Sequence, residues 1–203
     1  MARRVSPLLE WAHWAVAAAL ERAARPLLAV DATAGNGHDT LFLARCVGED
    51  GLVLACDVQR AALEATRARL EAAGLAGRVR LALEGHEHLA RLLAAPAPDG
   101  SAPDALSGVA AAMFNLGFLP GSDKRVVTRP DTTLAALDGL LPRITPGGVI
   151  SLHLYTGHDG GAEEASAVLS RAASLPAAAW SVLQSRVANR ERAREYLLLL
   201  ERL

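Results

Sequence analysis

The chain has little cysteine, almost no lysine and no net charge of either sign to speak of, and each shortage excludes a class of protein. Its 203 residues hold two cysteines, Cys46 and Cys56, which are too few for a disulfide framework or a cysteine-rich metal site. Lys124 is the only lysine. The formal net charge of −1 gives no general attraction to nucleic acid. An RNA partner must therefore be held by a local patch of positive charge.

The sequence also lacks an apolar run long enough to cross a membrane. Arg3 and Arg4 precede an apolar stretch, which superficially resembles a secretion signal. Glu10 and His13 interrupt that stretch, and its apolar residues recur at helical spacing instead. We therefore expect a cytoplasmic protein with no membrane partner.

A glycine turn after the first strand-like run has the pattern of a nucleotide-binding loop. Gly35 and Gly37 allow a strand-to-helix turn to bring bare backbone N–H groups close to a ligand, with Asn36 between them. Asp31 precedes this turn, and Asp57 ends the next strand-like run, where nucleotide-binding folds place the acid that receives ribose hydroxyls. The alternative for the glycines is a plain tight turn. Asp57 has an alternative of its own as a helix N-cap, which is compatible in geometry with a ligand contact.

Short β-type runs alternate with helix-period segments, which is typical of a parallel sheet with helices on both faces. The last two runs, 180–187 and 195–201, are joined by a connection too short for a parallel crossover, so they predict an antiparallel hairpin. The length predicts one domain over 1–203, with an N-terminal helix (1–25) packed on the sheet. The earlier strands are expected at 27–31, 52–57, 79–83, 109–114 and 148–154, and helices at 38–47, 60–73, 87–93, 132–142 and 163–175.

This arrangement is the α/β, Rossmann-like fold of class I S-adenosylmethionine-dependent methyltransferases, and it differs from that of dinucleotide dehydrogenases. Thr40 points the same way, because it stands where a dinucleotide-binding motif carries glycine or alanine for tight packing under a pyrophosphate. The sequence therefore favours S-adenosyl-L-methionine as the cofactor.

Further cofactor contacts are expected after the second and third strands. We expect Gln59 to bond the ribose or the adenine edge, and Gly85 and His86 to flank the adenine. The histidines and glutamates of 84–88 have the wrong spacing for a metal-binding helix pair, so we expect no metal. Asp39 suits the dipole of the helix that it opens, whatever the ligand.

The segment after the fourth strand carries the candidates for the methyl acceptor. Asn115 stands where methyltransferases acting on amino nitrogens place a polar residue, and its side chain can accept a hydrogen bond from an amine. Phe118 is suited to stack on a base, whereas Phe114 is expected to be buried. In the glycine-rich loop 157–161, His158 is either a substrate contact or part of a simple turn.

The chain resembles the YtqB/MnmM family, often labelled rRNA methylase, over essentially its whole length. This resemblance implies a class I methyltransferase fold. It also implies methylation of the 5-aminomethyl group on 2-thiouridine at the tRNA wobble position, which gives the 5-methylaminomethyl form. The residues that carry the resemblance are 31–40 (DATAGNGHDT), 57–59, 85–87, 114–124 (FNLGFLPGSDK) and 132–133.

The resemblance also implies roles for individual residues, and this chain departs from the family at some of them. Phe118 replaces a usual tyrosine, and Gly85 replaces a more usual serine. Asn189 is followed by arginine, where the family more often has glutamine and prolines. Cofactor contacts are implied for Asn36, Asp57, Gln59, Gly85 and His86, and substrate approach for Asn115, Thr132 and the loop through Lys124.

The sequence as a whole predicts an S-adenosylmethionine-dependent N-methyltransferase acting on the anticodon loop of tRNA, with Asn115 orienting the amine. An alkyl amine is mostly protonated at neutral pH, so Asp31, His158 or bulk water must accept its proton. The alternatives are an rRNA or small-molecule methyltransferase on the same fold, a nucleotide-dependent oxidoreductase and a non-catalytic RNA-binding module. The oligomeric state is left open, a homodimer included.

Overall fold

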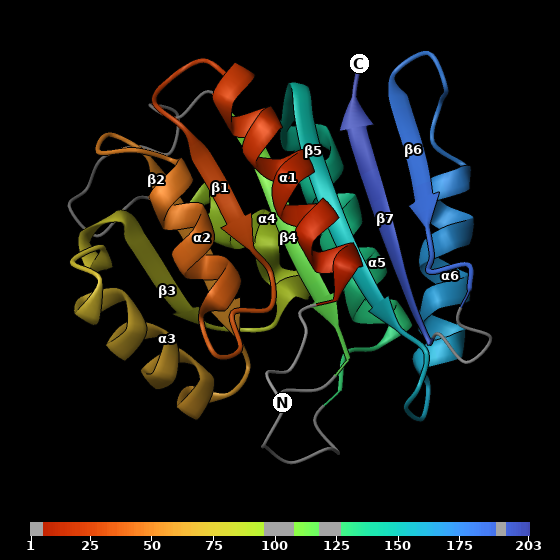
Figure 1. The fold of residues 1–203 in the computed structure, drawn as a ribbon, viewed down its shortest axis with the longest axis horizontal. Helices are drawn as coiled ribbons and strands as arrows, with labels where there is room; N and C mark the ends of the chain where they lie inside the picture. Colours follow the sequence, from red (N-terminus) through yellow and green to blue (C-terminus); the bar gives the residue numbers. More distant parts are fainter. Residues whose placement is uncertain (1–5, 96–107, 118–126, 190–193) are drawn as a thin grey trace.

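The computed structural model describes residues 6–95, 108–117, 127–189 and 194–203, which form a sheet with the strand order β3-β2-β1-β4-β5-β7-β6 (Figure 1). The first five strands along the chain run parallel, and β7 pairs antiparallel with both β5 and β6. The predicted C-terminal hairpin is therefore confirmed. The strands are β1 (Leu28–Asp31), β2 (Leu52–Asp57), β3 (Val79–Leu83), β4 (Val109–Leu116), β5 (Ile144–Tyr155), β6 (Trp180–Ser185) and β7 (Glu195–Arg202).

Helices cover both faces of the sheet, as predicted. One apolar core lies between the sheet and α1, α2 and α3, and a second lies between the sheet and α4, α5 and α6. Figure 1 shows α1 and α2 in front of the sheet and α5 and α6 behind it. The helices are α1 (Pro7–Arg22), α2 (His38–Cys46), α3 (Arg60–Ala72), α4 (Leu89–Ala94), α5 (Pro130–Leu140) and α6 (Gly161–Ala173). No helix in the described ranges is long and apolar enough to cross a membrane.

Strand β4 shows why the strands of this sheet are near-continuous apolar runs in the sequence. Met113 belongs to the core beneath α1, whereas the next residue, Phe114, lies in the opposite core with 1% of its surface exposed. A strand covered on both faces needs apolar side chains at every position, which is typical of parallel sheets. The burial expected for Phe114 is confirmed.

Strands β4 and β5 are longer than the sequence predicts by two residues or more. Strand β5 begins at Ile144, which pairs with Val109; the next pair is Val149 with Ala111, so the extra residues of this irregularity lie in β5. Strand β4 runs on to Leu116, so Asn115 lies within the strand, opposite His153 of β5. The carboxyl ends of the parallel strands therefore meet at one edge of the sheet, together with the beginning of the antiparallel β7 at Glu195.

Candidate active site

The glycine turn between β1 and α2 is held in a backbone conformation that requires glycine. Gly35 has φ of 52° and Gly37 has φ of 75°, both in the left-handed region. A Cβ atom on Gly37 would lie 2.8 Å from the Cα atom of Thr66 in α3. The Thr66 hydroxyl donates to the Gly35 carbonyl at 3.1 Å, and Arg69 Nε donates to the Asn36 carbonyl at 2.7 Å. Helix α3 thus fixes the turn from behind.

Asp57, at the end of β2, is joined to this turn. Its Oδ2 accepts from the Gly35 N–H at 2.9 Å, and its Oδ1 accepts from the Gln59 N–H at 2.8 Å. The N-cap interpretation is wrong, because α3 begins at Arg60 with Gln59 as its N-cap residue. A carboxylate has about four acceptor positions, so two remain for donors such as ribose hydroxyls.

Asp31 lies beneath the turn with none of its surface exposed. Its carboxylate accepts from the Thr33 N–H at 3.1 Å and from the Thr40 hydroxyl at 2.6 Å. Burial, reinforced by the negative charge of Asp39, raises the pKa of Asp31 to about 7. The Thr40 side chain therefore has a structural reason to stand at this position of the motif: it binds the acid that supports the turn.

His86 belongs to a buried polar network on the expected adenine side. Its Nε2 lies 3.4 Å from the Thr133 hydroxyl, and its ring meets Phe114 edge-on, with centroids 6.0 Å apart. The carboxylate of Glu164, in α6, accepts from Thr133 at 2.7 Å and from Thr128 at 2.6 Å. Burial lowers the pKa of His86, which keeps the imidazole neutral at pH 7.

Gly85 precedes His86 and is buried against a neighbouring acid. A Cβ atom at Gly85 would meet the carboxylate of Glu87, whose flexible end would have to move. Glycine is therefore accommodated where the family more often has serine. In the described part of the chain, no group of three or more histidine, cysteine or acidic side chains is placed to hold a metal ion.

Asn115 is held from two sides on the face of the sheet that α1 and α2 cover. Its backbone N–H donates to the Thr33 hydroxyl at 2.8 Å, and its side-chain amide donates to Oδ2 of Asp39. Oδ1 of Asp39 lies 2.7 Å from His13 Nε2 in α1. Sequence reasoning gave Asp39 only a helix-dipole role. The signal in the sequence for a larger role is His13, a titratable side chain on the same helical face as Leu9, Val16 and Leu20.

A second buried histidine lies beside Asn115. His153 is 1% exposed, and its Nε2 is 3.1 Å from Oε2 of Glu195, which also accepts from the Ser6 hydroxyl. Its ring stacks on Tyr155 with centroids 4.4 Å apart, and the Tyr155 hydroxyl lies 3.3 Å from His153 Nδ1. Burial lowers the pKa of His153, so this imidazole is also neutral at pH 7. The sequence had pointed to neither His153 nor Tyr155.

The structure brings His158 close to the same edge. A Cβ atom on Gly117 would lie 3.5 Å from His158 Nε2, so the imidazole is adjacent to the end of β4. Its Nδ1 lies 2.9 Å from the Asp159 carbonyl oxygen. Gly117 follows Asn115 by two residues, directly after the end of β4.

The other predicted substrate residues divide into one that the structure describes and two that it does not. Thr132 lies in the first turn of α5, where its hydroxyl donates to the Arg129 carbonyl at 3.0 Å. Phe118 and Lys124 lie outside the described residues. For these three the substrate role stays a prediction.

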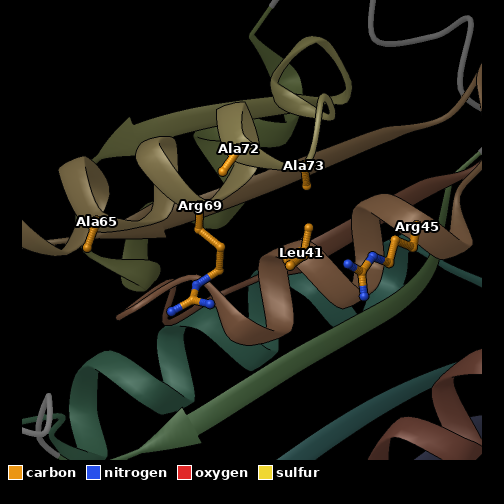
Figure 2. Close-up of a pocket in the computed structure, with 6 residues that line it drawn as sticks. All are labelled: Leu41, Arg45, Ala65, Arg69, Ala72 and Ala73. Atoms are coloured by element: carbon orange, nitrogen blue, oxygen red, sulfur yellow. The ribbon is translucent and has the colours of Figure 1, made fainter.

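A groove runs between α2 and α3 (Figure 2). Its walls are side chains of these two helices rather than strand ends, so it is separate from the edge that holds Asn115 and Asp57. Arg69 links the two regions, because its Nε holds the Asn36 carbonyl of the glycine turn. The lining residues are Leu41, Arg45, Ala65, Arg69, Ala72 and Ala73.

Comparison with known proteins agrees with this geometry. Residues 53–201 match the family model described as "Putative rRNA methylase". The Arabidopsis thaliana protein named "tRNA (mnm(5)s(2)U34)-methyltransferase, chloroplastic" is 35% identical over 181 residues. That match covers 85% of this chain but 62% of the plant protein, so the chain spans less than two thirds of the relative's length.

Solved structures give the same result over the full length. A Clostridium thermocellum protein titled "putative rRNA-methylase" superposes with a TM-score of 0.84 at 31% identity, covering 99% of this chain and all of that one. A "putative methyltransferase" of Streptococcus mutans, solved in complex with SAH, gives a TM-score of 0.80 at 31% identity, covering 98% and 100% of the two chains. The chain has a class I methyltransferase fold and belongs to the rRNA methylase family, the YtqB/MnmM family.

Proposed function

We propose that this protein is an S-adenosylmethionine-dependent methyltransferase that converts 5-aminomethyl-(2-thio)uridine at wobble position 34 of tRNA into its 5-methylaminomethyl form. One observation carries the proposal: the Asn115 amide is fixed at the same sheet edge as the glycine turn and Asp57. The name of the plant relative supports the same reaction.

The residues around the glycine turn fit the cofactor. The left-handed glycines leave the turn without side chains, and Asp57 has spare acceptor positions for ribose hydroxyls. Gln59, Gly85 and His86 would complete the adenosine site, while the buried Asp31 would act by supporting the turn. When bound, S-adenosylmethionine supplies a methyl group activated by a positively charged sulfur.

The substrate amine must then be positioned near this methyl group, and a strong acid or base is less important. The Asn115 carbonyl oxygen would accept an N–H of the amine and orient its lone pair, a role that depends on a fixed side-chain conformation. Asp31 has none of its surface exposed, so it is not open to a bound amine. This leaves His158 and water as acceptors of the amine proton at the surface.

A local positive patch supports an RNA partner. Three exposed arginines lie near the carboxyl edge of the parallel strands: Arg129 in the segment between β4 and α5, Arg186 directly after β6 and Arg194 directly before β7. Within the described ranges none of the three has an acidic partner, unlike Arg22 and Arg171. Such arginines can bind phosphates in a chain whose net charge gives no general attraction.

We place the enzyme, as one domain over 1–203, in the cytoplasm with its tRNA.

Methylation of tRNA by the purified protein tests the proposal. The substrates would be rRNA and tRNA from cells that lack the gene, in which the wobble nucleotide is not methylated. Each would be incubated with the protein and S-adenosylmethionine, digested and analysed by nucleoside mass spectrometry. We expect 5-aminomethyl-2-thiouridine to decrease and the 5-methylaminomethyl nucleoside to increase, with no methyl gain in rRNA. Methylation confined to rRNA, or tight binding of NAD without S-adenosylmethionine in calorimetry, would contradict it.

A further inference from the structure

We propose that Asp39, held in place by His13, is a positioning residue that turns the Asn115 carbonyl oxygen toward the substrate amine, so that helix α1 forms part of the active site. This inference rests on the proposed function, because it assigns a role to residues around the amine. It concerns three side chains from three elements: α1, α2 and β4.

The orientation of Asn115 follows from what a carboxylate can do. An ionised carboxylate accepts hydrogen bonds and donates none, so the end of the Asn115 amide that meets Asp39 must be its NH2 group. The carbonyl oxygen then faces away from Asp39. With the backbone N–H of Asn115 bound to the Thr33 hydroxyl at 2.8 Å, the residue is fixed through both its main chain and its side chain.

Asp39 needs a second partner to hold this geometry, because its side chain is only 6% exposed. His13 provides it: Nε2 lies 2.7 Å from Oδ1 and must donate there. Phe42, one turn after Asp39 in α2, stacks on the His13 ring with centroids 4.1 Å apart and planes 11° apart. Phe42 therefore fixes the plane of the imidazole ring, and the hydrogen bond fixes its distance from Asp39.

If Asp39 only stabilised its helix, its contacts would not need to extend to Asn115 on β4. A buried acid near the start of a helix is already favoured by the helix dipole. Here the acid also links α1 to Asn115, so a displacement of α1 would change the direction of the Asn115 amide. This coupling separates a positioning role from simple helix stabilisation.

Matched variants of His13 and Asp39 test the inference. Asp39→Asn keeps the size of the side chain but lets either end of the Asn115 amide face it. His13→Phe keeps a ring on Phe42 without an N–H donor, whereas His13→Gln keeps a donor. Asp50→Asn removes one charge from an exposed site and serves as the control. We expect kcat on tRNA to fall at least tenfold in Asp39→Asn and His13→Phe, and less than threefold in His13→Gln and Asp50→Asn.

Two readouts separate positioning from general damage. The Kd for S-adenosylmethionine, measured by calorimetry, should stay within twofold of the wild type in all four variants. The side-chain ¹H–¹⁵N resonances of Asn115 should move in Asp39→Asn and His13→Phe but not in Asp50→Asn. The double variant Asp39→Asn/Asn115→Asp restores an amide–carboxylate pair and should recover part of kcat.

The outcomes distinguish this inference from the proposed function. A wild-type protein that does not methylate tRNA would refute the proposed function, whatever the NMR spectra show. An active wild type whose Asp39→Asn and His13→Phe variants keep full kcat would overturn the positioning role alone. Unmoved Asn115 resonances, or a loss of cofactor affinity in parallel with kcat, would overturn it too.

Discussion

The carboxylate of Asp57 accepts a hydrogen bond from the backbone N–H of Gly35 at 2.9 Å, which joins the end of β2 to the glycine turn that follows β1. The same carboxylate accepts from the Gln59 N–H, so one side chain fixes the two loops that would contact the adenosine. Loss of Asp57 should therefore affect both a ligand contact and the shape of its site.

We expect Asp57→Ala to weaken S-adenosylmethionine binding by at least tenfold. Hydrogen bonds to charged groups contribute about 1.5–3 kcal/mol each, and the variant also releases the Gly35 N–H. Isothermal titration calorimetry measures the Kd, with the exposed Asp50→Ala as the control for lost charge. Equal affinities in the two variants would contradict the role of Asp57.

Gly37 should tolerate a side chain much less well than another glycine of the same backbone conformation. Gly37→Ala adds a Cβ atom 2.8 Å from the Thr66 Cα atom, on top of the strain of a left-handed residue, which is about 1–2 kcal/mol. Gly74 has φ of 69°, and a Cβ atom there meets no atom within 4 Å. Gly74→Ala thus carries the strain without the clash.

Urea unfolding of both variants measures the difference. We expect Gly74→Ala to lose about 1 kcal/mol and Gly37→Ala at least about 2 kcal/mol more, together with most of its cofactor affinity. If the two variants lose the same stability, the contact with Thr66 is not what makes glycine necessary in this turn.

The buried Asp31 should make stability depend on pH. Its pKa is about 7 in the native state against an ordinary value of 3.8, so between these values the native state binds more protons than the unfolded state. The free energy of unfolding therefore falls as pH rises through this window, by about 1.4 kcal/mol per unit and by about 2 kcal/mol between pH 5 and 7.

The variant Asp31→Asn isolates this effect. His86 and His153 have lowered pKa values and act in the opposite direction below about pH 6.5, but they are present in both proteins. The free energy of unfolding of the wild type, measured in urea at pH 5 and pH 7.5, should thus fall relative to that of the variant. Parallel pH profiles would show that Asp31 is ionised in the native state.

The sequence could predict the strands and the glycine turn because their signals are local. Strands 52–57 and 79–83 have the predicted limits, since apolar runs bounded by turn residues mark them. The neighbours of Asn115 carry no such signal. His153 lies beside it through strand register, and His13 reaches Asp39 only because α1 packs across β4 and β5. Such long-range packing is not written in any local pattern.

Substitution of Glu164 should lower the free energy of unfolding. It is 2% exposed, and its two oxygens accept from Thr133 and Thr128, on the two sides of the beginning of α5. Glu164→Ala would leave both hydroxyls without this acceptor, at a cost of about 2–4 kcal/mol. Glu164→Gln keeps one carbonyl oxygen and should cost less.

The adjacent Glu163 provides the control, because it lies in the same first turn of α6 but is exposed. Glu163→Ala should change the free energy of unfolding by no more than about 0.5 kcal/mol, the usual range for surface sites. Thermal and urea unfolding of the three variants give the order directly. Because the Thr128 N–H also donates to the Gly117 carbonyl at 3.0 Å, Glu164→Ala should further speed amide exchange at Thr128, whereas Glu163→Ala should not. Equal exchange in both variants would show that Glu164 does not hold this segment.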